Sequence, residues 1–226
     1  MCGRVRLATD YTELKIQLSL EDFGLVPNLR PSWNIAPTQD MLVALRDPER
    51  ATRVAKPMHW GLIPSWSKDA KMKYATFNAK SETVATSASF RAAWKAGRRC
   101  LIVTDGFYEW RKSDKQPFTI ARKDGKLTIM AGLWESWRSP ANEVVNSCTI
   151  LTTTPNSLMA MLHARMPVIL AAEDWPVWLG EVPANDDAVT ALLRPCPAED
   201  LVLWPVDTRV GNVRNNDASL IAAIQA

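Results

Sequence analysis

The alternation of apolar and polar positions along the chain predicts a protein rich in short strands. Brief runs of β-branched and apolar residues, bounded by proline, glycine or charged residues, are typical of strands. Strands are predicted in this way at residues 5–7, 41–45, 58–63, 100–104, 107–110, 147–153 and 201–206. Two further runs, 117–122 and 127–134, flank Lys123-Asp124-Gly125, so we expect them to pair as a hairpin.

Capping residues predict helices between these strands. Asp10, followed by Glu13, has the spacing of a capping box and should open a helix through Leu20. Asn78 is a second candidate N-cap, with Ser81 and Glu82 in the first turn of the helix that follows. Residues 33–38 are predicted to form a polar loop, and Asp105-Gly106 a turn. Further helices are predicted up to Gly97, from Thr154-Pro155 through Leu162, over 173–179 and over 186–193.

Length and composition indicate one domain without a membrane segment. The chain has 226 residues, 47% of them hydrophobic, and no shift in composition divides it. We therefore expect a single α+β domain over residues 1–226. No apolar run approaches the roughly 20 residues that a membrane span needs, and the amino terminus is too polar for a signal peptide. These features predict a cytosolic protein, or a nuclear one if the source is a eukaryote.

The four cysteines, Cys2, Cys100, Cys148 and Cys196, lack the spacings that are typical of metal ligands. Cys100 and Cys148 lie inside apolar runs, where a free cysteine behaves as a small buried hydrophobic residue. We therefore predict neither a zinc site nor a disulfide.

Lysines and aromatic residues are interleaved between Trp66 and Lys80. The net charge of +3 is only mildly basic, but ten tryptophans is a high number for this length. The residues of this segment that concern us are Trp66, Lys68, Lys71, Lys73, Tyr74, Phe77 and Lys80. Lysines can neutralise phosphates and exposed rings can stack on bases, so the segment is a candidate nucleic-acid surface. The alternative is a solvated loop with buried rings.

Cys2 is the candidate nucleophile. If Met1 is removed, Cys2 carries a free α-amine and a thiol, whose ordinary pKa values are about 8 and about 8.5. Such an aminothiol condenses with an aldehyde to a Schiff base and then, by attack of the thiol, to a thiazolidine. The alternative is that this cysteine has no chemical role.

Glu109 and His163 are the candidate proton carriers. Glu109 is flanked by aromatic residues, and alternation along its predicted strand favours an exposed side chain. In an apolar pocket, the pKa of the same carboxyl would rise into the range of a general acid. His163 follows a predicted helix and precedes Pro167, where it could serve either a structural or a catalytic role.

Seven short motifs follow one another along the chain. They are Met-Cys-Gly-Arg (1–4), Trp-Asn-Ile-Ala-Pro (33–37), Trp-Gly-Leu-Ile-Pro-Ser-Trp (60–66), Asn-Ala-Lys-Ser-Glu-Thr (78–83), Asp-Gly-Phe-Tyr-Glu-Trp (105–110), His-Ala-Arg-Met-Pro (163–167) and Val-Gly-Asn-Val (210–213). Together and in this order they resemble the motifs of the SOS response-associated peptidase (SRAP) family of abasic-site processing proteins. The resemblance extends along nearly the whole chain.

The resemblance implies a compact α+β fold, with a curved, mostly antiparallel sheet or open β-barrel bordered by helices. It also implies a covalent thiazolidine crosslink between Cys2 and the ring-opened aldehyde of an abasic site in single-stranded DNA. Asn78 would orient the amine and thiol, Glu109 would be the acid and base, and His163 would serve Schiff-base formation, resolution or reversal. No metal or organic cofactor is implied.

The resemblance further implies a DNA-binding surface. Its residues would be Arg4, Asn34, Pro37, Trp66, Lys80, Trp110, Thr152, Arg165 and Asn212. The sequence departs from the family pattern at Lys80, where arginine is common, and at Ser67, where some bacterial members carry a second tryptophan. Lysine replaces a forked phosphate contact with a point charge, so we expect weaker DNA binding.

Two other functions stay open at this point. One is a thiol peptidase or amidohydrolase that uses Cys2, including removal of its own Met1, and cleavage of DNA beside the lesion is a related activity. The other is a non-catalytic module that binds single-stranded DNA. For the leading hypothesis we expect a monomeric bacterial protein of the DNA-damage (SOS) response that acts on single strands or single-strand/duplex junctions. It would be cytoplasmic and would associate with the nucleoid when bound to DNA.

Overall fold

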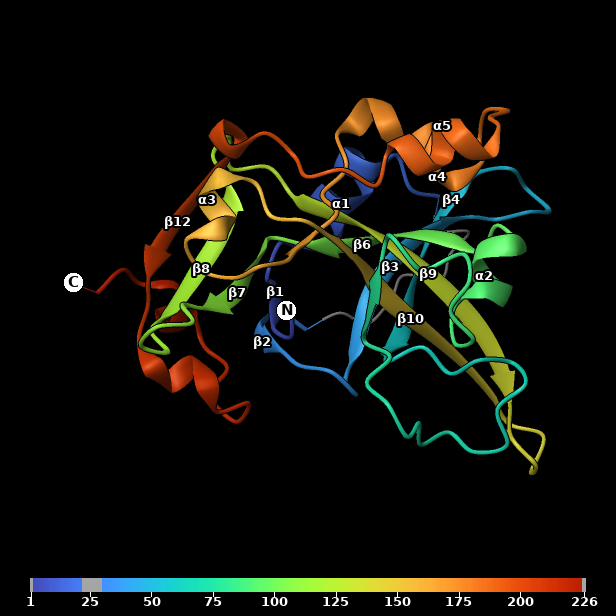
Figure 1. Cartoon of the computed structure of the whole chain (residues 1–226), viewed down its shortest axis with the longest axis horizontal. Coiled ribbons are helices and arrows are strands. Elements are labelled where there is room, and N and C mark those ends of the chain that lie inside the picture. Colours follow the sequence, from blue (N-terminus) through green and yellow to red (C-terminus); the bar gives the residue numbers. More distant parts are fainter. Residues whose placement is uncertain (1, 22–29, 225–226) are drawn as a thin grey trace.

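Two β-sheets pack on a common hydrophobic core in the computed structural model, which describes residues 2–21 and 30–224. Within these residues, one sheet has five strands in the order β12-β8-β7-β1-β2. The other has seven, in the order β11-β10-β4-β3-β6-β9, with β5 added beside β10. β1 lies in the middle of the molecule, between β7 and β2 (Figure 1).

The elements have the following bounds. The five-stranded sheet consists of β1 (Val5–Leu7), β2 (Ser32–Ile35), β7 (Gly106–Trp110), β8 (Pro117–Arg122) and β12 (Leu201–Pro205). The seven-stranded sheet consists of β3 (Asp40–Arg46), β4 (Arg53–Trp60), β5 (Asn78–Lys80), β6 (Arg99–Thr104), β9 (Thr128–Arg138), β10 (Val144–Thr153) and β11 (Met166–Pro167). The α-helices are α1 (Tyr11–Leu18), α2 (Arg91–Lys95), α3 (Ser157–Ala160), α4 (Trp175–Leu179) and α5 (Asp186–Ala191). The 3₁₀ turns are η1 (Ala172–Asp174), η2 (Ala198–Asp200), η3 (Thr208–Gly211) and η4 (Ala218–Ile221).

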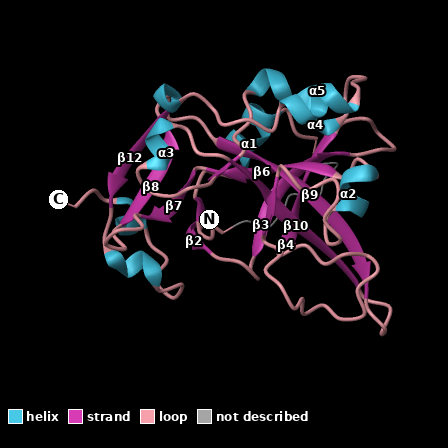
Figure 2. Ribbon diagram, in the orientation of Figure 1, coloured by secondary structure: helices cyan, strands magenta, loops and turns pink. Residues whose placement is uncertain are grey.

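The predicted α+β class is confirmed. The paired strands are antiparallel except where β10 runs parallel to β4 and β5, and the short helices lie at the periphery of the strands (Figure 2). Asp10 caps α1 as predicted, because its side chain accepts the backbone N–H of Glu13 at 3.1 Å. Glu13 does not complete the capping box, since its carboxylate accepts from Gln17 instead.

The predicted hairpin of residues 117–122 and 127–134 is wrong, although both strands exist. β8 pairs with β7 and β12, whereas β9 pairs with β6 and β10, so the turn at Lys123-Asp124-Gly125 carries the chain from one sheet to the other. A local turn signal does not distinguish these cases, because both require a reversal at Gly125, whose φ is +73°.

Four other predicted elements are corrected. Asn78 begins strand β5 rather than a helix, because its backbone pairs with Ile150 of β10. Residues 33–38 contribute to β2 instead of forming only a loop, and β4 begins and ends earlier than predicted. α3 is capped by Asn156 rather than Thr154, since the Asn156 side chain accepts from the N–H of Met159 at 2.9 Å.

Strand β7 is covered on both of its faces. Phe107 packs in the main core, while the neighbouring Tyr108 packs in a second cluster with Val206 and Val210. Glu109 therefore points back toward the side of Phe107 and is only 5% exposed. This overturns the exposed position that alternation favoured, because alternation predicts a wet face only where the sheet has one.

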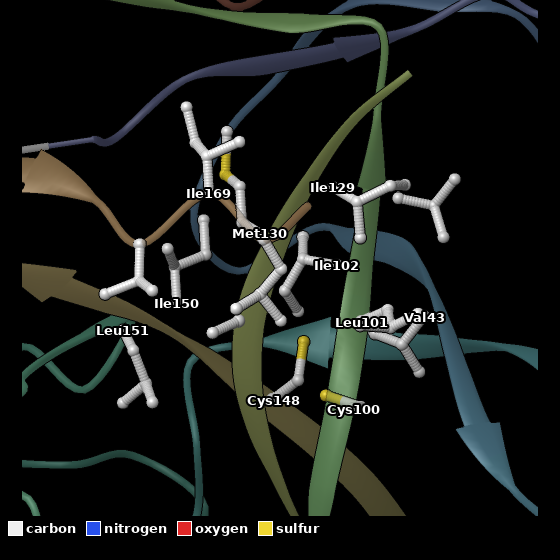
Figure 3. Packing of buried hydrophobic residues seen from close by; sticks show 14 of the residues in the cluster. Val43, Cys100, Leu101, Ile102, Ile129, Met130, Cys148, Ile150, Leu151 and Ile169 are labelled. Atoms are coloured by element: carbon white, nitrogen blue, oxygen red, sulfur yellow. The ribbon is translucent and has the colours of Figure 1, made fainter. Parts of the chain in front are cut away.

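The main core contains the two internal cysteines. Cys100 of β6 and Cys148 of β10 are fully buried among residues such as Ile102, Met130 and Ile150 (Figure 3), as predicted. Cys2, Cys100, Cys148 and Cys196 are free thiols. No helix in the described part of the chain is both long and apolar enough to cross a membrane.

Candidate active site

Cys2 lies immediately before β1 and is packed into the main core at 1% exposure. Two contacts fix its position. The Asn78 side chain donates from Nδ2 to the Cys2 carbonyl oxygen at 2.7 Å, and the Arg4 backbone N–H donates to the Cys2 thiol. The cysteine predicted to be the nucleophile is therefore held on two sides. Met1 lies outside the described residues, so its removal stays a prediction.

Glu109 reaches this cysteine through the pairing of β1 with β7. Val5 is opposite Phe107, and the Tyr108 N–H donates to the Arg4 carbonyl at 2.9 Å. Continuing the antiparallel register places Glu109 opposite Gly3, next to Cys2. The carboxylate is close enough for its charge to act on the Cys2 thiol.

Burial is the main cause that raises the pKa of the Cys2 thiol far above its usual range, and the charge of Glu109 raises it further. The hydrogen bond from the Arg4 backbone lowers the pKa in part. At neutral pH the thiol is therefore protonated, so Cys2 needs a base or a reaction partner that accepts its proton.

Only one of the two polar side-chain atoms of Asn78 forms a hydrogen bond with the described residues. Its Nδ2 holds Cys2, while its Oδ1 is buried and has no hydrogen-bond partner among the described residues. A buried acceptor without a donor is costly, so the position favours a donor group that is supplied at Cys2. The predicted neighbours Cys2, Asn78 and Glu109 are thus brought together from three separate segments.

His163 lies in the turn that follows α3. Its Nδ1 lies 3.0 Å from the Arg165 backbone nitrogen, whose N–H it accepts when unprotonated, and 3.3 Å from the Arg165 carbonyl oxygen, to which it donates when protonated. The turn contacts the chain just after β7, because the Lys112 N–H donates to the Leu162 carbonyl at 3.2 Å. The structure therefore holds the His163 turn against the strand that carries Glu109.

Arg165 is already engaged within the protein. Its two terminal nitrogens form a forked pair with Glu82, at 2.5 and 2.9 Å, and Nη2 also donates to the Thr152 carbonyl at 2.5 Å. This pairing lowers the pKa of the Glu82 carboxyl. Sequence reasoning did not assign a role to Glu82, because nothing in its local motif indicates a partner so distant in the chain.

Arg4 and Asn34 hold the carboxy-terminal segment. Arg4 Nη1 donates to the Asn34 side chain and to the Val210 carbonyl, both at 2.7 Å. Asn34 Nδ2 in turn donates to the Asn215 carbonyl at 2.7 Å. The Arg4 guanidinium also lies over the Trp110 ring, 5.8 Å from its centroid.

Five of the nine predicted DNA-binding residues differ clearly in their exposure. Trp66 is 59% exposed, and Lys80 and Asn212 are also exposed, so these side chains can reach a ligand directly. Asn34 and Thr152 are buried and bonded to their protein neighbours, so in this structure they support other residues instead. For all nine residues, including Arg4, Pro37, Trp110 and Arg165, contact with DNA stays a prediction.

The segment from Trp66 to Lys80 has two exposed rings, and its use as a nucleic-acid surface stays a prediction. Tyr74 is 79% exposed and Trp66 is largely exposed, whereas Phe77 packs on the core against Trp60. The lysines at 68, 71, 73 and 80 are also exposed. Within the part of the chain that is described, no cluster of histidine, cysteine or carboxylate residues is arranged to bind a metal.

Comparison with known proteins identifies relatives along nearly the whole chain. Residues 1–213 match the family model "SOS response associated peptidase (SRAP)". The abasic site processing protein YoqW of Bacillus subtilis is 38% identical, with 98% of this chain and 99% of the relative covered. The abasic site processing protein HMCES of Xenopus tropicalis is 36% identical over 86% of this chain and 67% of its own.

Solved structures share the fold. A protein of Bacteroides thetaiotaomicron superposes with a TM-score of 0.85 at 21% identity, covering 99% of this chain and 100% of its own. A protein of Bordetella bronchiseptica does so with a TM-score of 0.78 at 28% identity, covering 91% and 100%. The arrangement of the two sheets is therefore found in other solved proteins.

The charge of Glu109 should be detectable in the reactivity of Cys2. Because Glu109 raises the pKa of the thiol, Glu109→Gln is expected to speed alkylation of Cys2 by iodoacetamide at neutral pH, by about threefold. In both proteins the rate should rise with pH, since only the thiolate reacts. Peptide mass spectrometry over a pH series gives the rates.

Cys196 is the internal control. Burial raises its pKa to about 11, and Glu109 is not among the causes, so its alkylation rate should be the same in both proteins. An unchanged or slower reaction of Cys2 in Glu109→Gln would show that the carboxylate does not act on the thiol.

Proposed function

The chain belongs to the SOS response-associated peptidase (SRAP) family, and we propose that it processes abasic sites in DNA with Cys2 as its nucleophile. The substrate is supported by the names of relatives such as YoqW, which this chain covers almost completely. In the proposed reaction, loss of Met1 frees the Cys2 α-amine. The amine and thiol then capture the aldehyde of the abasic deoxyribose in one crosslink.

The position of Cys2 between Asn78 and Glu109 is the observation that carries this proposal. A cysteine used only for packing would not need an asparagine side chain that donates to the Cys2 carbonyl at 2.7 Å, nor a buried carboxylate whose charge acts on its thiol. Buried polar groups are costly, and where they converge on one nucleophile they favour catalysis over structure.

The first proposed step opens the sugar. An abasic deoxyribose is mostly a closed hemiacetal, and its C1′ aldehyde forms when a proton leaves the C1′ hydroxyl and another reaches the ring oxygen. Glu109 would move these protons. The free acceptor Oδ1 of Asn78 would bind an N–H of the Cys2 amine, which turns the nitrogen lone pair toward C1′.

The next steps form the crosslink. Attack of the Cys2 amine on C1′ gives a carbinolamine, and loss of one water gives the Schiff base. His163 would donate the proton that this water carries away as its imidazolium cation, whose Nδ1–H the Arg165 carbonyl can accept at 3.3 Å. The Cys2 sulfur then adds to C1′ while its proton passes to the nitrogen. Aldehyde and aminothiol thus become thiazolidine and water, without an oxidant or reductant.

This order of steps fits a protonated thiol better than peptide hydrolysis does. A thiol peptidase needs a thiolate for its first bond, but burial and the charge of Glu109 both disfavour a thiolate at Cys2. In the crosslinking reaction the amine makes the first bond, so the thiol can stay protonated until the Schiff base has formed. Removal of Met1 by the protein itself and cleavage of DNA beside the lesion stay hypotheses.

The proposed substrate is single-stranded DNA or a single-strand/duplex junction. Lys80 and the other exposed lysines would neutralise phosphates, and the exposed ring of Trp66 would stack or wedge against bases. We keep the expectation that the protein acts as a monomer without a cofactor and joins the bacterial nucleoid when bound to DNA.

Replacement of Cys2 tests the proposed function. Mature wild-type protein incubated with a single-stranded oligonucleotide that carries one abasic site should give a heat-stable shifted band on a denaturing gel. Cys2→Ala should give no such band, because it lacks the thiol that closes the ring. The intact mass of each protein must first confirm that Met1 has been removed.

An undamaged oligonucleotide serves as the matched substrate control and should form no band. Equal crosslinking by wild type and Cys2→Ala would overturn the role of Cys2. Absence of a band with mature wild type would shift the interpretation to amide hydrolysis, or to simple binding if abasic and undamaged DNA bind equally well.

The pairing of Arg165 with Glu82 predicts how charge affects DNA binding. Glu82 occupies both terminal nitrogens of Arg165 and places a negative charge where a phosphate would lie. Glu82→Gln should therefore tighten binding of single-stranded DNA about fivefold, or on the order of 1 kcal/mol. The slope of log affinity against log salt should become steeper by about 0.7, which corresponds to one additional phosphate contact.

Glu49→Gln makes the same change of charge at an exposed turn between β3 and β4, so it should leave the salt slope unchanged. Fluorescence anisotropy at several salt concentrations measures both quantities. Weaker binding by Glu82→Gln would instead mean that Glu82 orients Arg165 for the phosphate.

A further inference from the structure

The chain between β4 and β5 forms a loop at one edge of the larger sheet. The Gly61 N–H donates to the Cys148 carbonyl at 3.0 Å, and the Ile150 N–H donates to the Phe77 carbonyl at 3.1 Å. β4 and β5 therefore follow one another along the same edge of β10, both parallel to it. The chain leaves the sheet at Gly61, extends away from β10 and returns at Phe77 (Figure 1).

A hollow of about 760 Å³ lies where this loop leaves and rejoins the sheet. Trp60 and Phe77 line it and are fixed to each other. Their rings meet edge to face with centroids 6.0 Å apart, and Trp60 Nε1 donates to the Phe77 carbonyl at 2.8 Å. Lys71, Lys73 and Tyr74 line it from the loop, and all three are exposed. The hollow thus has one side fixed by an aromatic contact and a hydrogen bond, and another side formed by exposed residues of the loop.

The lining of the hollow suits a flat aromatic ligand attached to phosphates. Most of the lining is apolar, and its size is that of a small-molecule site. Among the aromatic rings of the hollow, Tyr74 is exposed, Phe77 is partly buried and Trp60 is fully buried beneath the surface. Its charged residues are Lys71 and Lys73, and among the described lining residues none is acidic. Aromatic surface next to cations, without opposing anions, is the combination that binds nucleobases in single strands.

The hollow adjoins the proposed active site. Phe77, which lines the hollow, directly precedes Asn78, whose side chain holds Cys2. Pro37, one of the predicted DNA-binding residues, lines it as well. We therefore expect a strand with its abasic sugar at Cys2 to place a neighbouring nucleotide near the hollow.

We propose that this hollow binds the nucleobase next to the abasic nucleotide and that Tyr74 stacks on that base. The proposal rests on the proposed function, since it assumes that the abasic sugar lies at Cys2. A base beside an abasic site has lost one stacking neighbour, so turning it out of the strand costs less than it would in undamaged DNA. The hollow would thus add affinity specifically next to a lesion.

The first test changes the DNA by removing the base next to the abasic position. The probes are labelled single-stranded oligonucleotides with tetrahydrofuran, an abasic analogue without an aldehyde, at the central position. In one probe the 5′ neighbour is also tetrahydrofuran, and in another the 3′ neighbour. By fluorescence anisotropy, loss of the base on one of the two sides should weaken binding by wild type about tenfold. Loss of a base four nucleotides away should have no such effect.

Replacement of Tyr74 tests the proposal in the protein. Tyr74→Ala should weaken binding of the probe with intact neighbours by a similar factor. The affinity of this variant should then fall little further when the neighbouring base is removed. Tyr74→Phe keeps the ring and should bind as wild type does. Ile16→Ala, which removes another exposed apolar side chain on α1, is the matched control and should change nothing. Because Tyr74 is 79% exposed, these variants should fold normally, and thermal unfolding verifies this.

The proposal would be overturned if the losses of affinity from Tyr74→Ala and from removal of the neighbouring base were additive. It would also be overturned if removal of the base on either side caused no loss of affinity. The same proteins are also tested for crosslinking to a true abasic site. If crosslinks form but the neighbouring base has no effect, the hollow is excluded and the proposed function stands. If wild type forms no crosslink, the proposed function itself fails.

Discussion

The backbone pairing of residues 4–6 with β7 is the interaction on which the rest of the site depends. Chain termini usually fray unless a sheet or another element holds them. Here the first strand lies between β2 and β7, and the Arg4 side chain also holds the carboxy-terminal segment through Val210. This pairing keeps Cys2 inside the molecule and sets Glu109 beside it. The proposed nucleophile is thereby held in one position, as catalysis would require.

Burial of Cys2 has opposing consequences for its two reactive groups. It suppresses the thiolate, because the charged form loses its hydration and faces the charge of Glu109. Next to the proposed amine, it leaves one acceptor, Asn78 Oδ1, without a hydrogen-bond partner among the described residues. It would also keep out water that could hydrolyse a Schiff base. The site is therefore better suited to chemistry that begins with the amine and ends with the thiol than to the reverse order.

Local sequence patterns predicted the elements but not the contacts between distant ones. Apolar runs correctly predicted the positions of β6, β7, β8 and β10, because the side chains of these strands are largely buried. The same patterns wrongly paired 117–122 with 127–134 and wrongly exposed Glu109. Both errors arise from the second layer: the chain changes sheets at Gly125, and residues near the carboxy terminus cover the outer face of β7. The family motifs assigned Cys2, Asn78 and Glu109 to one reaction, and their catalytic roles stay predictions, although the structure brings the three residues together. The pairing of Arg165 with Glu82 became visible only in three dimensions.

The central claim is that the amine and the thiol of Cys2 both bind C1′ of the same sugar. The most direct test is tandem mass spectrometry of the crosslinked peptide, before and after treatment with sodium borohydride. A thiazolidine has no imine, so the account predicts an adduct on the amino-terminal residue Cys2 whose mass does not change on reduction. An adduct that gains two hydrogens, or one that maps to a lysine, would contradict the account.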